Sequence, residues 1–89
     1  MIPPSELLAS FERHYRRGRN SRRSVRLNDR LYDELGVDSL LASELVVALE
    51  DDFDVQLLHD PRVWQIGTVG ELLELVGMLA SERHLRAAA

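Results

Sequence analysis

The chain has 89 residues, a formal net charge of −4 and no cysteine. A chain of this length can bury one modest core, which predicts a single domain over residues 1–89 and argues against a large catalytic cleft. The lack of cysteine excludes disulfides and a thiolate nucleophile, and no apolar run is long enough for a membrane span. Because the first residues lack the basic and apolar segments of a secretory signal, we expect a cytoplasmic protein.

The first predicted helix covers residues 5–15, and an arginine-rich loop follows over residues 16–37. Pro4 suits the start of a helix, because proline has no N–H group to leave unpaired there. Gly18 and Asn20 then interrupt the helical pattern. The apolar positions of this helix recur with helical spacing at Leu7, Leu8, Phe11 and Tyr15.

The second predicted helix covers residues 39–53 and begins at a serine. Asp38 is placed to cap its free N–H groups, and Gly36 permits a sharp bend into that cap. Ser39 then occupies the first helical position, where the helix dipole favours an anion such as a phosphodiester. The apolar stripe of this helix recurs at Leu41, Leu45, Ala48 and Leu49.

Two further helices complete the predicted fold. Pro61 suits the first turn of a short third helix over residues 61–65. Thr68 and Glu71 have the spacing of a capping box, which opens a fourth helix over residues 69–85. We therefore predict an all-α fold, a small and mostly antiparallel bundle of three longer helices and one short third helix with a long first loop.

Three blocks, residues 31–40, 44–55 and 68–72, closely resemble the acyl carrier protein family, whose motif is read here as Asp38-Ser39-Leu40. The resemblance implies a four-helix bundle of the acyl-carrier type with 4′-phosphopantetheine bound covalently to Ser39. Asp38 would cap the helix and help a transferase to recognise it. The terminal thiol of the arm would carry acyl intermediates as thioesters to enzymes of fatty acid, polyketide or related biosynthesis.

The resemblance also implies partners: a phosphopantetheinyl transferase, and acyl- or ketosynthase-type and other thioester-processing enzymes. We expect a monomer that is not itself an enzyme and binds no metal, because the histidines are isolated and no nucleophile motif is present. The family's partner-binding face falls on Leu40, Ser43, Glu44, Val47, Glu50 and Asp51. The predicted core, which would also form the walls around an acyl chain, comprises Leu45, Val46, Leu49, Phe53, Ile66 and Leu72.

Charge is divided sharply along the chain, with a net +5 over residues 1–30 and −7 over residues 38–60. The positive part contains the cluster Arg13, Arg16, Arg17, Arg19, Arg22, Arg23 and Arg26. A solvated loop whose arginines pair with nearby acids is the favoured interpretation, and docking of an acidic protein is an alternative. Nucleic acid binding is disfavoured, because only Tyr15 could stack on a base near the cluster.

Two alternatives stay open at the sequence level. Trp64 is unusual for the family's third helix, and it either touches an acyl chain or an enzyme, or covers the open side of the bundle as a core residue. The whole chain, in turn, could be an unmodified carrier-like bundle that acts as a protein-interaction or regulatory module.

Overall fold

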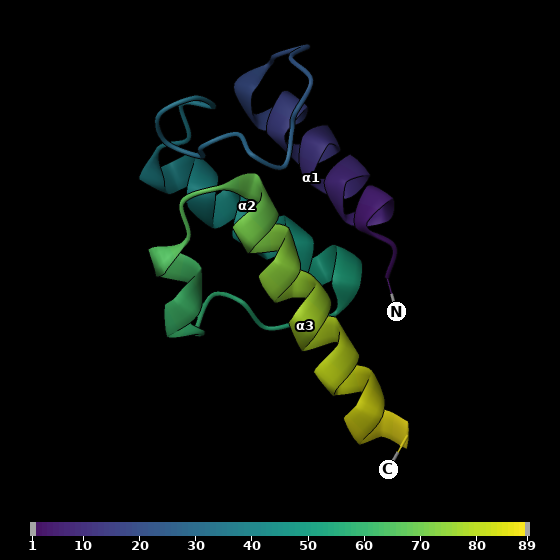
Figure 1. Cartoon of the computed structure of the whole chain (residues 1–89). Coiled ribbons are helices and arrows are strands. Elements are labelled where there is room, and N and C mark those ends of the chain that lie inside the picture. Colours follow the sequence, from purple (N-terminus) through teal and green to yellow (C-terminus); the bar gives the residue numbers. More distant parts are fainter. Residues whose placement is uncertain (1, 89) are drawn as a thin grey trace.

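Three α-helices and one 3₁₀ helix follow one another along the chain (Figure 1). The computed structural model describes the backbone of residues 2–88 and the side chains of residues 2–83. The elements are α1 (Pro4–Arg19), α2 (Ser39–Phe53), η1 (Pro61–Gln65) and α3 (Val69–Ala88). The predicted all-α bundle with three longer helices, a short third helix and a long first loop is confirmed.

The second and third helices have the predicted bounds, whereas the ends of α1 and α3 differ from the prediction. α1 continues four residues beyond Tyr15, so Arg16 and Arg17 belong to the helix and not to the loop. Asn20 ends the helix with φ 52° and ψ 47°, a left-handed cap conformation. The arginines of this last turn interact favourably with the negative end of the helix dipole. The sequence prediction did not take this stabilisation into account and ended the helix too early. α3 likewise runs to Ala88 instead of residue 85.

The core lies where the three α-helices meet, and α1 contributes an aromatic pair to it that contacts the first loop (residues 20–38). Phe11 and Tyr15 are buried with their ring centroids 6.3 Å apart and an interplanar angle of 7°. The Tyr15 hydroxyl donates a hydrogen bond of 2.7 Å to the Leu35 carbonyl oxygen. Since a buried hydroxyl is costly without a partner, this bond fixes the first loop against α1. The largest fully buried side chains are Phe11, Leu35, Leu45, Leu49, Leu57, Val69 and Val76.

The first loop is held against the start of α3 by backbone hydrogen bonds. The Val69 and Gly70 N–H groups donate to the Asp29 and Leu27 carbonyl oxygens at 3.0 and 2.7 Å. A side chain at Gly70 would bring its Cβ within 3.0 Å of that Leu27 oxygen, so glycine is required for the approach. The predicted capping box at Thr68 is also present, with reciprocal 3.2 Å bonds to Glu71. The N–H groups at the start of α3 are thus satisfied.

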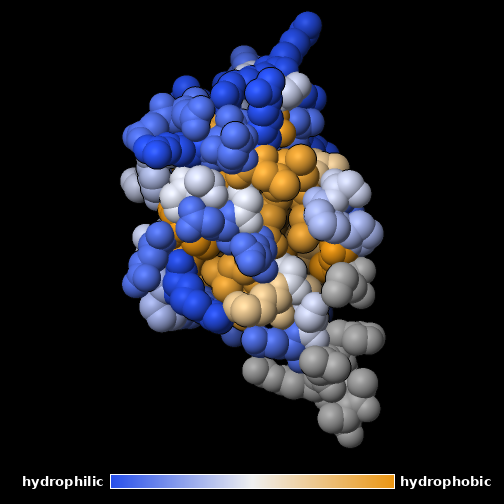
Figure 2. All heavy atoms as spheres, viewed as in Figure 1, coloured by the Kyte–Doolittle hydropathy of each residue, from blue (hydrophilic) through white to orange (hydrophobic). Residues whose placement is uncertain are grey.

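Acidic side chains also organise the arginine-rich segment. The buried Asp29 carboxylate accepts from the Arg26 N–H at 2.8 Å and pairs with Arg23 at 3.3 Å. Arg16 pairs with Glu12 at 3.4 Å. Arg16 and Arg23 thus pair with nearby acids, as predicted for the cluster, whereas no ion pair among the described residues involves Arg17, Arg19, Arg22 or Arg26. Figure 2 shows this end of the molecule as strongly hydrophilic, with apolar side chains exposed beneath it.

Asp52 connects α2 to α1 through three side chains. Its carboxylate accepts a hydrogen bond from the buried Ser10 hydroxyl and lies 3.1 Å from Arg13 Nη2 and 2.9 Å from His14 Nε2. The hydrogen bonds from Ser10 and then His14 lower the pKa of Asp52 below its ordinary value of 3.8. Since all three partners lie on one face of α1, this single carboxylate sets how the two helices meet.

We expect Asp52→Asn to lower the free energy of unfolding by about 1 kcal/mol at neutral pH, because a charged acceptor of three hydrogen bonds is lost. The folded-state pKa lies below the unfolded one, so this stabilisation is present above about pH 3.8 and disappears as the pH falls through the folded-state pKa. Chemical denaturation at neutral pH and near pH 3 would measure both effects. Asp51→Asn removes the same charge one residue away and is the matched control. An equal loss in that variant would contradict the specific role of Asp52.

Candidate functional site

The start of α2 is built by a bend, a cap and a hydroxyl in succession. Gly36 has φ +64°, a left-handed conformation that glycine adopts without strain, and it turns the chain toward the helix. Asp38 is extended, with φ −95° and ψ 179°, and its Oδ1 accepts from the Leu41 N–H at 2.8 Å. Ser39 is the first residue of the helix, as the sequence predicts.

The Ser39 residue is exposed to solvent, and among the described residues its hydroxyl has no hydrogen-bond partner. Its backbone carbonyl oxygen accepts from the Ser43 hydroxyl at 3.1 Å. A hydroxyl at this place is accessible to a modifying enzyme, and the positive end of the helix dipole favours a phosphate bound to it. Within the side chains of residues 2–83, no three acidic or histidine residues converge as metal ligands.

Most of the predicted partner-binding residues lie on the surface of α2 beyond Ser39. Leu40 is 69% exposed and Val47 is 44% exposed, an unusual degree for apolar side chains of this size. Glu44 and Asp51 are also exposed, whereas Ser43 is half-buried. Apolar and acidic side chains are thus exposed along α2 from its first to its last turn, and their role in docking stays a prediction.

Glu50 differs from the other residues of that predicted face. Its Oε2 accepts from the Leu57 and Leu58 N–H groups at 2.6 and 3.0 Å. The carboxylate is half-buried and holds the segment between α2 and η1. This role could not be predicted from the sequence, because the bonded groups are backbone atoms seven and eight residues away.

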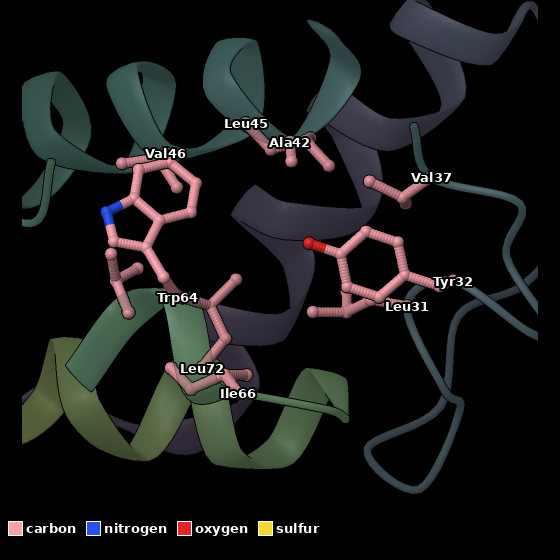
Figure 3. A pocket seen from close by; sticks show the side chains of 10 residues that line it. Leu31, Tyr32, Val37, Ala42, Leu45, Val46, Trp64, Ile66 and Leu72 are labelled. Carbon is pink, nitrogen blue, oxygen red and sulfur yellow. The ribbon is translucent and has the colours of Figure 1, made fainter. Parts of the chain in front are cut away.

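A small cavity lies between α2, η1, α3 and the first loop (Figure 3). Its volume is about 20 Å³, which is room for about one water molecule. Of the six residues predicted to form the walls around an acyl chain, four line this cavity, whereas Leu49 and Phe53 do not. The lining residues are Leu31, Tyr32, Val37, Ala42, Leu45, Val46, Val63, Trp64, Ile66 and Leu72.

Two aromatic side chains flank this cavity from different segments. Figure 3 shows Trp64, from η1, and Tyr32, from the first loop, on opposite sides of it. Trp64 is 50% exposed and its Nε1–H donates to the Leu58 carbonyl oxygen at 3.3 Å. Of the two alternatives for Trp64, its position favours contact with a bound molecule over a role in the core. Tyr32 was not predicted here, because only the folding of the first loop brings it to α2.

The last turn of α1 lies directly beside the start of α2. A Cβ at Gly18 would fall 2.5 Å from Leu41 Cδ1, so the absence of a side chain lets the two turns touch. Arg19 Nη2 lies 3.3 Å from the position that a Cβ atom would occupy at Gly36. The arginine-bearing last turn of α1 thus lies near Ser39, a proximity that sequence spacing could not indicate.

Comparison with known proteins identifies one family. A model of the phosphopantetheine attachment site matches residues 19–76, which include the first loop, α2, η1 and the first turns of α3. The chain is similar to an acyl carrier protein of Sulfurovum sp., with 36% identity over 52 residues that make up 58% of this chain and 68% of the relative. It is similar to those of Clostridium acetobutylicum, with 31% identity over 52 residues (58% and 66%), and Phaeodactylum tricornutum, with 45% over 49 residues (55% and 63%). The aligned segment spans about two thirds of each relative.

We expect Asp38→Ala to lower the free energy of unfolding by about 1 kcal/mol, because the Leu41 N–H loses its acceptor at the helix start. Asp38→Asn keeps an oxygen that can accept this bond and should cost only a few tenths of a kcal/mol. Thermal and urea denaturation of the two variants would measure the difference. Equal losses would show that the carboxylate does not act as the helix cap.

Proposed function

This chain belongs to the phosphopantetheine-binding carrier proteins, and from that premise we propose that it is an acyl carrier protein whose arm is attached to Ser39. The family is non-catalytic and has a phosphopantetheine attachment site. The observation that carries the proposal is the exposed Ser39 hydroxyl at the capped start of α2, inside the matched segment.

Loading would join the Ser39 oxygen to the phosphorus of the 4′-phosphopantetheine moiety of coenzyme A. The hydroxyl proton passes to a base of the transferase, and 3′,5′-ADP leaves. Asp38 keeps the helix start rigid, and the dipole of α2 stabilises the new phosphodiester charge. Once attached, the arm supplies a thiol that holds an acyl group as a thioester. Tethering then gives each partner enzyme a high local concentration of substrate.

The surface around Ser39 suits docking of a separate enzyme. Leu40 and Val47 offer exposed apolar area, and Glu44 and Asp51 place negative charge beside it. Such a combination accelerates encounter with positively charged surfaces. The family implies a phosphopantetheinyl transferase and processing enzymes as partners. No helix within residues 2–88 is long and apolar enough to cross a membrane.

The cavity between α2 and η1 is the candidate site for the acyl chain. Its walls are apolar, but its volume of about 20 Å³ is too small for more than one or two carbon atoms. An acyl chain would therefore displace η1, a short element whose connection to α2 depends on Glu50. Trp64 lies on this moving element and would cover the chain.

We expect intact-mass analysis, after incubation with coenzyme A, Mg²⁺ and a broad-specificity transferase, to show one added phosphopantetheine on the wild-type chain. Ser39→Ala should gain none, whereas Ser24→Ala, which removes an exposed serine hydroxyl of the first loop, should be loaded like wild type. No gain in wild type would favour the unmodified interaction or regulatory module. Loading of Ser39→Ala would place the arm on another residue.

Trp64 is the single tryptophan of the chain and lines the cavity, so all tryptophan fluorescence comes from a side chain at this site. We expect its emission to shift to shorter wavelength when the arm carries an octanoyl group, and to stay unchanged with an acetyl group. Ala42→Leu should reduce the octanoyl shift, because Ala42 lines the cavity and the larger side chain would fill it. Identical emission spectra of the octanoyl and acetyl forms would contradict the proposed acyl site.

A further inference from the structure

The predicted partner face of α2 continues onto α1. A shallow groove between the two helices is lined by His14 and Arg17 of α1 together with Ser43, Glu44, Val47 and Asp51 of α2. Four of the six residues predicted to contact partner enzymes thus share one groove with two residues of α1. An enzyme that docks on α2 would meet α1 as well.

The groove approaches Ser39 because α1 and α2 run in opposite directions. Asp52, near the end of α2, contacts Ser10 and His14, whereas Leu41, near its start, contacts Gly18. Arg17 therefore lies beside the first turns of α2. Arg19 extends toward Gly36, three residues before Ser39. Both arginines are exposed.

The charges around this groove divide into paired and unpaired groups. Arg13 and His14 pair with Asp52, and Arg16 pairs with Glu12. Among the described residues, no ion pair involves Arg17, Arg19, Glu44 or Asp51. Two positive and two negative groups are therefore available to a partner at the docking surface. This surface is bipolar and not uniformly acidic.

We propose that Arg17 and Arg19 determine which enzymes this carrier serves. They repel a docking patch made only of lysine and arginine, and they favour a patch that places carboxylates opposite α1 and basic groups opposite Glu44 and Asp51. Like charges brought together at an interface exclude wrong partners, whereas complementary ones set the docking register. The inference rests on the proposed carrier function, because it concerns the surface from which the arm on Ser39 would be delivered.

A solvated surface without specificity and a nucleic acid site are the competing explanations. A phosphate backbone would meet Glu44 and Asp51 beside the arginines, and the groove is lined by no phenylalanine, tyrosine or tryptophan for stacking. If the surface is solvated and has no specificity, kcat/KM of a partner enzyme cannot depend on which arginine is removed. Position is therefore the variable to test.

The test uses two double variants that lose the same charge at different places. Arg17→Gln with Arg19→Gln removes the arginine that lines the groove and the one that extends toward Gly36, whereas Arg22→Gln with Arg26→Gln removes two exposed arginines of the first loop. Each protein is loaded, checked by intact mass and given the same acetyl group. The probes are two ketosynthases chosen by the side chains around their active-site entrances, one purely basic and one with both carboxylates and basic groups.

We expect the Arg17 and Arg19 double variant to raise kcat/KM with the basic ketosynthase by about five- to tenfold at low salt, and to lower it by a similar factor with the mixed one. The Arg22 and Arg26 double variant should change either value by less than about twofold. Circular dichroism of each variant confirms that the fold is kept.

If the two double variants change kcat/KM equally, the total charge of the carrier and not the position of the arginines decides, and the proposal is overturned. If neither variant changes kcat/KM with either ketosynthase, the arginines belong to a solvated surface without a role in docking, and the proposal is likewise overturned. Salt-sensitive binding of the wild-type chain to a duplex oligonucleotide, abolished only in the Arg17 and Arg19 double variant, would replace it with a nucleic acid site. Failure of wild type to load refutes the carrier function itself, and the intact-mass check shows this before any ketosynthase is added.

Discussion

The hydrogen bond from the Leu41 N–H to the Asp38 carboxylate determines where α2 begins, and the geometry of the site depends on it. If the helix began one residue later, Ser39 would leave the helical turn and its hydroxyl would no longer have the orientation that the first helical position gives it. The bend at Gly36 and the contact of Leu41 with Gly18 hold the same turn from two sides. Three local constraints thus present one hydroxyl to solvent in a fixed orientation.

The acidic side chains of α2 serve different purposes although they stand close together in the sequence. Glu50 satisfies two N–H groups of the following segment, and Asp52 joins α2 to α1. Glu44 and Asp51 remain exposed. A net charge counted along the chain therefore overstates the acidity that a partner meets. The local field depends on which carboxylates are already compensated, and on the arginines that α1 places among them.

Sequence reasoning succeeded where the determining interactions are local. The bounds of α2, the Asp38 cap and the capping box of α3 follow from residues within one helical turn of each other. It ended α1 four residues too early, and it did not show how the first loop packs on α1, which depends on bonds such as that between Tyr15 and Leu35, twenty residues apart. Tyr32 at the cavity and Arg17 at the groove were missed for the same reason. Their positions depend on tertiary contacts that no periodicity encodes.

Glu50, a residue of the predicted partner-binding face, is connected to the cavity by two hydrogen bonds. Glu50 on α2 accepts from the Leu58 N–H, and the Leu58 carbonyl oxygen accepts from the indole of Trp64 beside the cavity. Both bonds are partly exposed, so each contributes on the order of 1 kcal/mol, which is small enough for docking contacts to compete with them. A side chain of a partner that bonds to Glu50 would release the Leu57 and Leu58 N–H groups and loosen the segment that leads to η1. The stability of η1 therefore cannot be independent of what binds to α2.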